Sequence, residues 1–354
     1  MVRIVLGRMM RRFRRLCALS AVTLLALPAV HATERVRLDD GHLQVEIAPG
    51  LGGRIVHLSL PGRSNLLKVG DAVANIPPPV PSADGENIPY MGHELWTGAQ
   101  SRWWLDQDVN AERRAAAAVW PPDPFLAYGR NRIVERSPLA LVLEGVDSPV
   151  SGLRASQSFR LSGQTPATLA LGAEAVNIRE REVRRNLWFN TRLPAGSRVF
   201  VPVAREADAR LRADEDASFA GPVAWWRDGL YSLQLAPPPP GKDGRRGKIF
   251  IAPSAGWIAG FNAGQLLLIR FERQPDTAID PEHGQVELYQ QWHADDPDAG
   301  LLELEVHAPM RSLAPGETMR SGETWTVFPY DGPDTLEAQR DALVAALRAL
   351  GLGH

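Results

Sequence analysis

The segment from Pro89 to Phe125 mixes aromatic side chains with side chains that form directional hydrogen bonds. It contains four tryptophans interspersed with acidic, basic and amide groups: Tyr90, His93, Glu94, Trp96, Gln100, Arg102, Trp103, Trp104 and Trp120. Sugar rings present apolar C–H faces and many hydroxyl groups, so their binding sites combine aromatic platforms with planar polar groups. The segment therefore predicts a site for a mono- or oligosaccharide. The alternative is that the tryptophans cover the ends of a β-sandwich core.

A second concentration of polar residues lies further along the chain. Side chains alternate between the two faces of a strand, so the strand predicted over 286–292 places Glu287 and Tyr289 on the same face. The same alternation puts Glu303 and Glu305 together on one face of the next predicted strand. A face that carries such acids could hold a general base, either Glu287 or Glu303. The alternative is that this face is simply solvated.

The sequence offers no recognised metal or cofactor motif. His293, Asp295 and Asp296 are ligand types for a cation, but their spacing matches no specific metal motif. The sequence also lacks a nucleophile elbow, a phosphate-binding loop, a dinucleotide fingerprint and a His-Glu-x-x-His motif. We therefore expect neither a metal nor a cofactor.

The first residues predict export from the cytoplasm. Five arginines between residues 8 and 15 precede an apolar run over 16–30, which ends in Ala29-Val30-His31-Ala32. A basic region, a short apolar core and small residues before the cut are typical of a signal peptide. Residues 1–32 are thus predicted to be removed on export to the periplasm. The run is shorter than the roughly twenty residues of a membrane span, and an uncleaved anchor is the alternative.

Removal of residues 1–32 changes what the chain can bind. These residues carry six arginines and no acids, so the formal net charge falls from −2 to −8. A domain this acidic, without a basic cluster, is a poor partner for nucleic acid or anionic lipid, and we expect neither. The only cysteine, Cys17, leaves as well, which excludes disulfides and thiolate metal sites from the mature chain.

Alternation of apolar and polar residues predicts an all-β domain over residues 33–332. Runs with a period of two residues recur between turn signals, and they occupy residues 36–38, 43–47, 139–143, 169–176, 248–251, 265–271 and 301–306. Strands separated by turns, with no helical pattern between them, indicate antiparallel sheets in a sandwich or barrel. Two proline stretches, Pro77–Pro81 and Pro237–Pro240, lack amide donors and are predicted to lie in loops, the second continuing through Gly247.

The C-terminal residues 333–354 predict a helix that packs on this domain. Asp334 and Glu337 form a capping-box pattern, and leucines with helical spacing follow them.

Several short motifs, taken in order, resemble those of galactose mutarotase-like (aldose epimerase) domains, in a bacterial branch known as a domain of unknown function. They are Gly52-Gly53-Arg54-Ile55, Asn65-Leu66-Leu67, Met91-Gly92-His93-Glu94-Leu95-Trp96, Trp120-Pro121-Pro122-Asp123, Val286-Glu287-Leu288-Tyr289, Leu302-Glu303-Leu304-Glu305, Leu313-Ala314-Pro315-Gly316-Glu317 and Glu323-Thr324-Trp325. The resemblance spans roughly residues 35–330. It implies a large antiparallel β supersandwich with a sugar groove on one concave face.

The resemblance also implies roles for individual residues. In true mutarotases a histidine protonates the ring oxygen and a glutamate takes the proton of the anomeric hydroxyl. Glu287 or Glu303 could match that glutamate, His93 a substrate-binding histidine, and Arg54 an arginine near the start of the groove. The family's Asn-His-x-Tyr-Phe-Asn pattern falls on residues 185–190, which puts Asn186 where the histidine stands. An amide cannot act as a general acid, so we expect the mutarotase reaction to be absent unless His93 or His293 replaces that histidine.

Three hypotheses follow from the sequence. The first is a periplasmic carbohydrate-binding domain whose substrate-binding residues are Arg54, Trp96, Arg102, Asn186, Trp188 and Tyr289. The second is an enzyme, either an aldose 1-epimerase or a related carbohydrate-active enzyme, with catalytic residues His93, Glu287 and Glu303. The third is a structural partner in an envelope polysaccharide system, which would present an exposed apolar patch to another protein.

Overall fold

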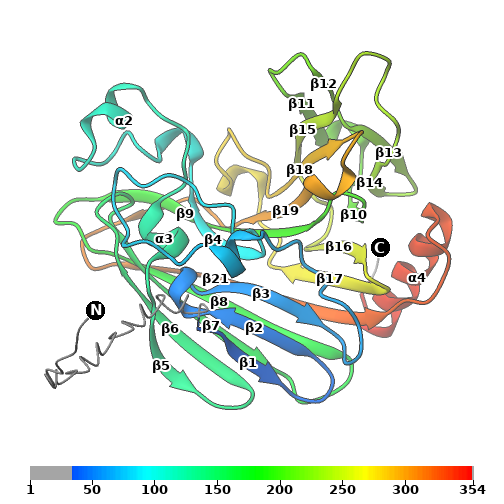
Figure 1. Ribbon diagram of the computed structural model, residues 1–354, viewed down its shortest axis with the longest axis horizontal. Helices are drawn as coiled ribbons and strands as arrows, with labels where there is room; N and C mark the ends of the chain where they lie inside the picture. The colour runs from blue at the N-terminus through cyan, green and yellow to red at the C-terminus, as the bar shows by residue number, and fades with distance from the viewer. Residues whose placement is uncertain (1–33, 353–354) are drawn as a thin grey trace, which may run out of the picture. The chain divides into compact units, whose positions relative to one another are not determined.

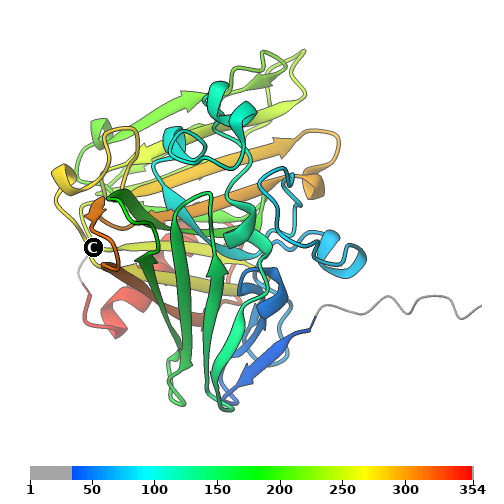
Figure 2. The same ribbon diagram turned by 90° about the vertical axis from the view of Figure 1, so that its left-hand side faces the viewer.

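The computed structural model describes residues 34–352, whose strands form two large sheets that lie one over the other (Figures 1 and 2). The predicted signal peptide, residues 1–32, lies outside the described residues. Within residues 34–352 one sheet has 11 strands and the other has 10. The expected all-β supersandwich is therefore confirmed. Its strand pairs are antiparallel, except that the short strand β12 runs parallel to β15.

The larger sheet, called sheet 1, has the strand order β1-β2-β3-β4-β9-β19-β18-β15-β11, with β12 beside β15 and β20 beside β9. The bounds of its strands are β1 Val36–Asp39, β2 Gln44–Ala48, β3 Arg54–Ser59, β4 His93–Gly98, β9 Val183–Pro194, β11 Ala209–Ala213, β12 Phe219–Ala220, β15 Gly244–Ile251, β18 Val286–His293, β19 Leu301–His307 and β20 Arg311–Leu313.

The other sheet, called sheet 2, has the order β13-β14-β10-β16-β17-β21-β8-β7-β6-β5. Its strands are β5 Arg132–Arg136, β6 Ala140–Asp147, β7 Leu153–Leu161, β8 Ala167–Asn177, β10 Arg198–Pro202, β13 Val223–Arg227, β14 Leu230–Gln234, β16 Trp257–Asn262, β17 Gln265–Phe271 and β21 Thr318–Pro329.

One face of each sheet is buried in a core that the two sheets share. Every second residue along β7 and β8 is buried, which is the period expected of strands with one covered face. In sheet 1, Leu302, Leu304 and Val306 of β19 belong to this core. Glu303 and Glu305, which alternate with them, therefore lie on the opposite face of sheet 1. That opposite face forms the floor of the candidate site.

Short helices and 3-10 turns connect the strands. They are α1 Ala72–Asn75, α2 Ala111–Ala115, α3 Pro124–Tyr128, η1 Pro49–Leu51, η2 Gln100–Arg102, η3 Glu206–Asp208, η4 Asp276–Ala278 and η5 Pro297–Ala299. The prolines of both predicted loops lie outside strands and helices, but the second loop ends earlier than predicted because β15 begins at Gly244. None of the helices within residues 34–352 is long and apolar enough to cross a membrane.

The C-terminal helix α4, Leu336–Ala349, packs on the outer face of sheet 2 (Figure 1). Leu343 and Leu347 are fully buried and share a cluster with Phe200 of β10 and Trp257 of β16. The N-cap is Thr335, whose hydroxyl accepts a hydrogen bond from the backbone N–H of Ala338, so the cap lies one residue after the predicted Asp334.

Candidate functional site

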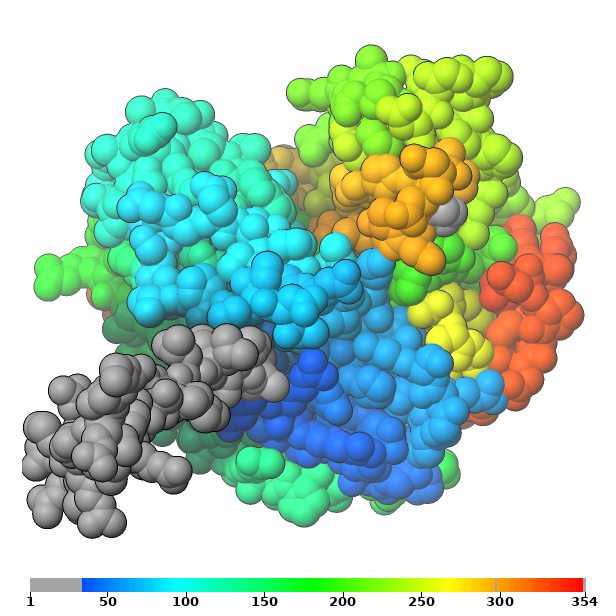
Figure 3. Space-filling view, viewed as in Figure 1, coloured from blue at the N-terminus to red at the C-terminus, as the bar shows by residue number. Residues whose placement is uncertain are grey.

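A groove of about 500 Å³ opens on the face of sheet 1 that turns away from the core. Figure 3 shows it as a recess between the segment that follows β4, in cyan and teal, and the strands β11, β15 and β18, in green to orange. The residues that line it are Asn87, Ile88, Pro89, Met91, Glu94, Trp96, Gln100, Trp120, Trp188, Arg192, Arg212, Ala213, Asp214, Gly247, Lys248, Tyr289, Gln291, Leu301 and Glu303.

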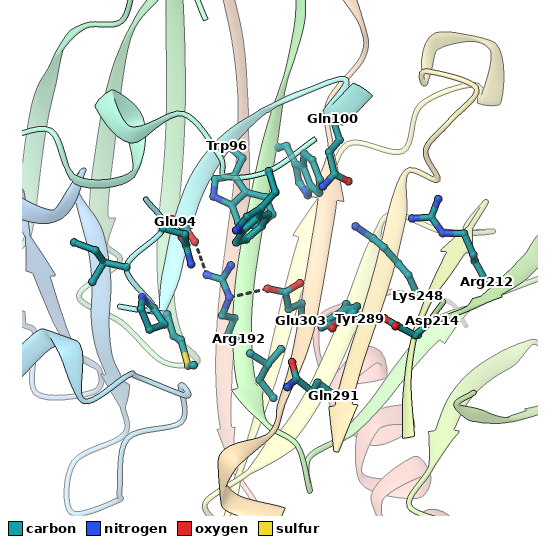
Figure 4. Close-up of a pocket in the computed structure, with 18 of the residues that line it drawn as sticks. Glu94, Trp96, Gln100, Arg192, Arg212, Asp214, Lys248, Tyr289, Gln291 and Glu303 are labelled. Atoms are coloured by element: carbon teal, nitrogen blue, oxygen red, sulfur yellow. Dashed lines mark hydrogen bonds and ion pairs between the residues drawn. The ribbon is translucent and has the colours of Figure 1, made fainter. Parts of the chain in front are cut away.

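One row of residues crosses the floor of the groove from strand to strand. Arg212 of β11 lies opposite Lys248 of β15, which lies opposite Tyr289 of β18. Tyr289 in turn lies opposite Glu303 of β19, and Glu303 lies opposite Arg192 of β9. Directly opposed residues point to the same face, so five strands present five polar side chains along one line (Figure 4).

Aromatic rings form the wall beside this row. Trp96 of β4 and Trp188 of β9 lie opposite each other, and their ring centroids are 4.9 Å apart at nearly a right angle. Trp120 follows at 6.3 Å from Trp96, and about half of its surface is exposed. Trp96 and Trp188 are buried, so Trp120 is the ring of this wall that is exposed next to the polar floor, the combination that a sugar ring requires.

An ion-pair chain fixes one end of the groove. The guanidinium of Arg54 contacts one oxygen of Glu94, and Arg192 donates to the other oxygen of Glu94 at 2.6 Å. Arg192 also donates to Glu303 at 2.7 Å. Burial opposes ionisation of Glu94, but the two guanidinium groups outweigh it and lower the pKa of Glu94 to about 2. Glu94 is therefore a carboxylate, and it holds Arg192 in place beside Glu303.

A second charged cluster lies beneath the other end of the groove. The ammonium of Lys248 is 2.6 Å from Glu287 and 2.9 Å from Glu305, both of which are fully buried. Burial raises the pKa of Glu305 to about 8, and the nearby carboxylates add to this although Lys248 opposes it. Glu287 keeps its charge, because Lys248 and two histidines outweigh its burial and lower its pKa. Lys248 also lies 4.8 Å from the ring centroid of Trp188.

Two histidines complete this buried cluster. The Nδ1 atom of His283 lies 2.8 Å, and the Nε2 atom of His307 3.5 Å, from the same oxygen of Glu287. Ligand atoms of these three residues lie within 4.8 Å of one another, and such residue types bind Zn²⁺. The other oxygen of Glu287 contacts the Lys248 ammonium, a cation that would repel a metal ion. We therefore assign the three residues to a hydrogen-bond network behind Trp188.

Six of the predicted site residues lie in the groove or directly behind it. Those that line it are Trp96, Trp188, Tyr289 and Glu303. Arg54 lies behind the wall in contact with Glu94, and Glu287 lies beneath Lys248. Neither Arg54 nor Glu287 lines the groove, because groove residues cover them. Their placement gives them a positioning role for the side chains in front of them.

His93, predicted as a catalytic residue, faces the core between the sheets. Glu94 and Trp96 of β4 line the groove, and successive side chains of a strand point to opposite faces. The side chain of His93 therefore points to the face opposite the groove. Its Nδ1 atom lies 2.9 Å from the hydroxyl of Thr191, and its ring packs edge-on against Trp325 at 4.8 Å. The predicted pairing of His93 with a groove glutamate is therefore not assembled in this structure.

Asn186 and Arg102, predicted to bind substrate, also lie outside the groove. Asn186 is fully buried, and its amide N–H group donates to the carbonyl of Ala308 at 3.1 Å, so this donor serves the interior. Arg102 is exposed and forms an ion pair with Asp106, four residues along the chain. The turn η2 directs Arg102 away from the groove, although the neighbouring Gln100 lines it.

Sequence reasoning missed the groove's three cations, Arg192, Lys248 and Arg212. Arg192 and Trp188 lie an even number of residues apart on one strand, so their side chains share a face, and this could have indicated Arg192. Lys248 was predicted to lie in a strand, but its partner strand β11 was not recognised, and Arg212 lies on that strand.

Comparison with known proteins places the fold. Residues 33–328 match the family described as "Domain of unknown function (DUF4380)". No curated protein matches the sequence. Among solved structures, the chain is similar to a galactose mutarotase-like protein from Lactobacillus casei, with 10% identity, a TM-score of 0.53 and coverage of 83% of this chain and 100% of that one.

Two further structures give the same result. The Slr1438 protein from Synechocystis has 12% identity and a TM-score of 0.54, over 84% of this chain and 96% of its own. A candidate aldose 1-epimerase from Klebsiella pneumoniae has 12% identity and a TM-score of 0.53, over 87% of this chain and 81% of its own. At these identities the likeness shows the fold, and the family match spans most of the chain. The chain belongs to the DUF4380 family of domains of unknown function and has the galactose mutarotase-like fold.

Proposed function

We propose that the groove on sheet 1 binds a saccharide, in the periplasm, after removal of residues 1–32. The observation that carries this proposal is the pairing of a tryptophan wall with a polar row along one side of a 500 Å³ groove. Trp120, about half exposed, offers a ring face to C–H groups and is backed by the buried Trp96 and Trp188, while Tyr289 and Gln291 offer hydrogen-bonding groups to hydroxyls. The groove lies on the fold that the mutarotase-like protein from Lactobacillus casei shares.

Binding without catalysis fits the groove better than epimerisation does. Ring opening requires an acid and a base on opposite sides of the sugar, each able to exchange a proton near neutral pH. No histidine is among the described residues that line the groove, and Glu303 is held by Arg192. The alternative is an aldose 1-epimerase. Polarimetry of freshly dissolved α-D-galactose tests it, because a rotation that decays faster than in buffer would establish that activity.

The binding proposal is tested with Trp120→Ala. About half of Trp120 is exposed, so its removal leaves the core closed, yet it lines the groove. We expect Trp120→Ala to weaken binding of a saccharide from a panel of mono- and oligosaccharides by about tenfold, or about 1.4 kcal/mol. Isothermal titration calorimetry measures the dissociation constants.

Trp226→Ala is the matched control. Trp226 is exposed to a similar extent, at 37%, but it lies on β13 of sheet 2 and does not line the groove. The Trp226→Ala variant should bind the saccharide with the same affinity as the unsubstituted protein. Equal affinities for Trp120→Ala, Trp96→Ala and Trp226→Ala, with folded circular dichroism spectra, would refute the assignment of the groove as the binding site.

A further inference from the structure

Two cations face each other at one end of the groove floor. Arg212 and Lys248 are directly opposed residues on β11 and β15, and both line the groove. Figure 4 shows their side chains extending from the sheet to the same side, into the cavity. Like charges on directly opposed residues repel each other, and here the carboxyl groups of Glu287 and Glu305 lie beside Lys248 from beneath the floor, whereas the Arg212 guanidinium extends into the groove.

The acids around this end of the groove are already engaged by other groups. Glu303 pairs with Arg192, and Asp214 pairs with Arg246 at 2.8 Å. Arg212 forms no ion pair with any residue in the part of the chain that the structure describes, and its side chain is exposed. An unpaired guanidinium at the rim of a groove is available to a ligand.

Lys248 adds a second cationic donor beside Arg212. It contacts Glu287 and Glu305, but the raised pKa of Glu305 leaves that carboxyl largely protonated at neutral pH. Glu287 therefore offsets Lys248, and the carboxylate of Glu282 offsets His283, whose pKa Glu282 and Glu287 raise to about 9 against its burial. The cluster beneath Lys248 is thus balanced, and the guanidinium of Arg212 adds a positive charge at this end of the groove, within a chain whose residues 33–354 have a formal charge of −8.

The position of the two cations fits a group attached to a sugar ring. Trp120 and Lys248 line the same groove, so a saccharide stacked on the exposed ring of Trp120 can direct a substituent of its own ring towards Lys248. Arginine binds carboxylate, phosphate and sulfate groups through two parallel N–H donors, and such charge-assisted bonds are stronger than those to hydroxyls.

We propose that the groove recognises an acidic saccharide, whose carboxylate, phosphate or sulfate group binds between Arg212 and Lys248. This proposal rests on the proposed saccharide-binding function and adds the class of saccharide. It also assigns Arg212 as the residue that selects charged over neutral sugars.

The experiment measures how strongly the protein prefers a charged sugar. Dissociation constants are determined by isothermal titration calorimetry at low salt for D-galactose, D-galacturonate and D-galactose 6-phosphate, and for the glucose counterparts of all three. We expect at least one charged sugar to bind about tenfold or more tightly than the neutral sugar, with the preference decreasing as salt is added. The galacturonate and phosphate arms identify which anionic group is bound.

Arg212→Gln tests the residue, and Arg210→Gln is its control. Both arginines are exposed on β11, and both guanidiniums lie over the Phe250 ring, at 5.1 Å for Arg212 and 5.6 Å for Arg210. Only Arg212 lines the groove. Arg212→Gln should reduce the charged-to-neutral preference by about tenfold, whereas Arg210→Gln should keep it. Lys248 is left unchanged because it neutralises buried Glu287.

The outcomes separate this inference from the proposed function. If the protein binds neutral and charged sugars equally, or if both arginine variants change the preference by the same factor, the acidic-saccharide inference is overturned and saccharide binding stands. If no sugar binds, and Trp120→Ala and Trp226→Ala behave alike on a wider oligosaccharide panel, the proposed function itself fails.

Discussion

Arg192 is the residue on which the charge arrangement of the groove depends. It is buried, it bridges Glu94 and Glu303, and its guanidinium lies 5.2 Å from the ring centroid of Trp96. A buried ion pair contributes little net stability compared with a well-packed apolar pair, but removal of one partner leaves the other charge buried without compensation. The series of ion pairs from Arg54 through Glu94 and Arg192 to Glu303 therefore fixes the positions of groove side chains.

This arrangement makes Arg192→Met strongly destabilising. We expect the free energy of unfolding, measured by urea denaturation at pH 7, to fall by about 3–5 kcal/mol, because Glu94 then keeps only Arg54. Glu303→Gln is the comparison, since Glu303 lies at the groove end of the chain and its side chain is 12% exposed. The free energy of unfolding should fall clearly less for Glu303→Gln than for Arg192→Met. A loss below about 1 kcal/mol for Arg192→Met would show that Glu94 does not depend on Arg192.

Strand β21 carries a buried acid in sheet 2. Glu323 is 4% exposed and accepts a hydrogen bond from the indole N–H of Trp325 at 2.7 Å. Burial raises the pKa of Glu323 to about 8, against a small opposing effect of that hydrogen bond. A carboxyl whose pKa is higher in the folded than in the unfolded chain favours folding fully only below its unfolded pKa. That contribution is lost as the pH rises from about 4.5 through about 8.

Glu323→Gln should remove this pH dependence. The variant has no carboxyl to ionise, so its melting temperature should exceed that of the unsubstituted protein by several degrees at pH 8.5 and by much less at pH 5. Glu174→Gln is the control on the neighbouring strand β8, where the Glu174 side chain is exposed. Thermal melts at the two pH values measure the effect, and a Glu323→Gln gain that is equal at both would contradict the buried-acid explanation.

The outer faces of the two sheets differ in what lies on them. Helix α4 covers part of the outer face of sheet 2 through Leu343 and Leu347, while the outer face of sheet 1 stays open as the groove. The shared core between the sheets connects the two faces only through packing. Stability contributed by the helix should therefore be separable from ligand binding.

Leu343→Ala tests this separation. Leu343 is fully buried, so its truncation should cost about 2–5 kcal/mol of unfolding free energy. Below the lowered melting temperature, the dissociation constant for the saccharide should stay within about twofold of that of the unsubstituted protein. Urea denaturation and calorimetry on the same preparation give both values. A large change in affinity would mean that α4 controls the groove.

Local patterns in the sequence were sufficient for the strands and for part of the groove. Alternation along 286–292 and 301–306 placed Tyr289 and Glu303 on the faces that they occupy. Alternation depends only on the geometry of a single strand, so one sequence is enough to read it. The motifs around Arg54 and Trp96 also indicated the fold.

The order of strands and the choice of face on β4 were decided by tertiary structure. All six residues of β4 are buried, so its sequence contains no alternation that could tell His93 from Glu94. The face was fixed by β9, whose Thr191 lies opposite His93 and whose Asn190 lies opposite Glu94, almost one hundred residues further along the chain. The pairing of Arg212 with Lys248 likewise cannot be predicted from the pattern of either strand alone. Pairing between distant strands depends on how the whole chain closes its core, and no single strand encodes it.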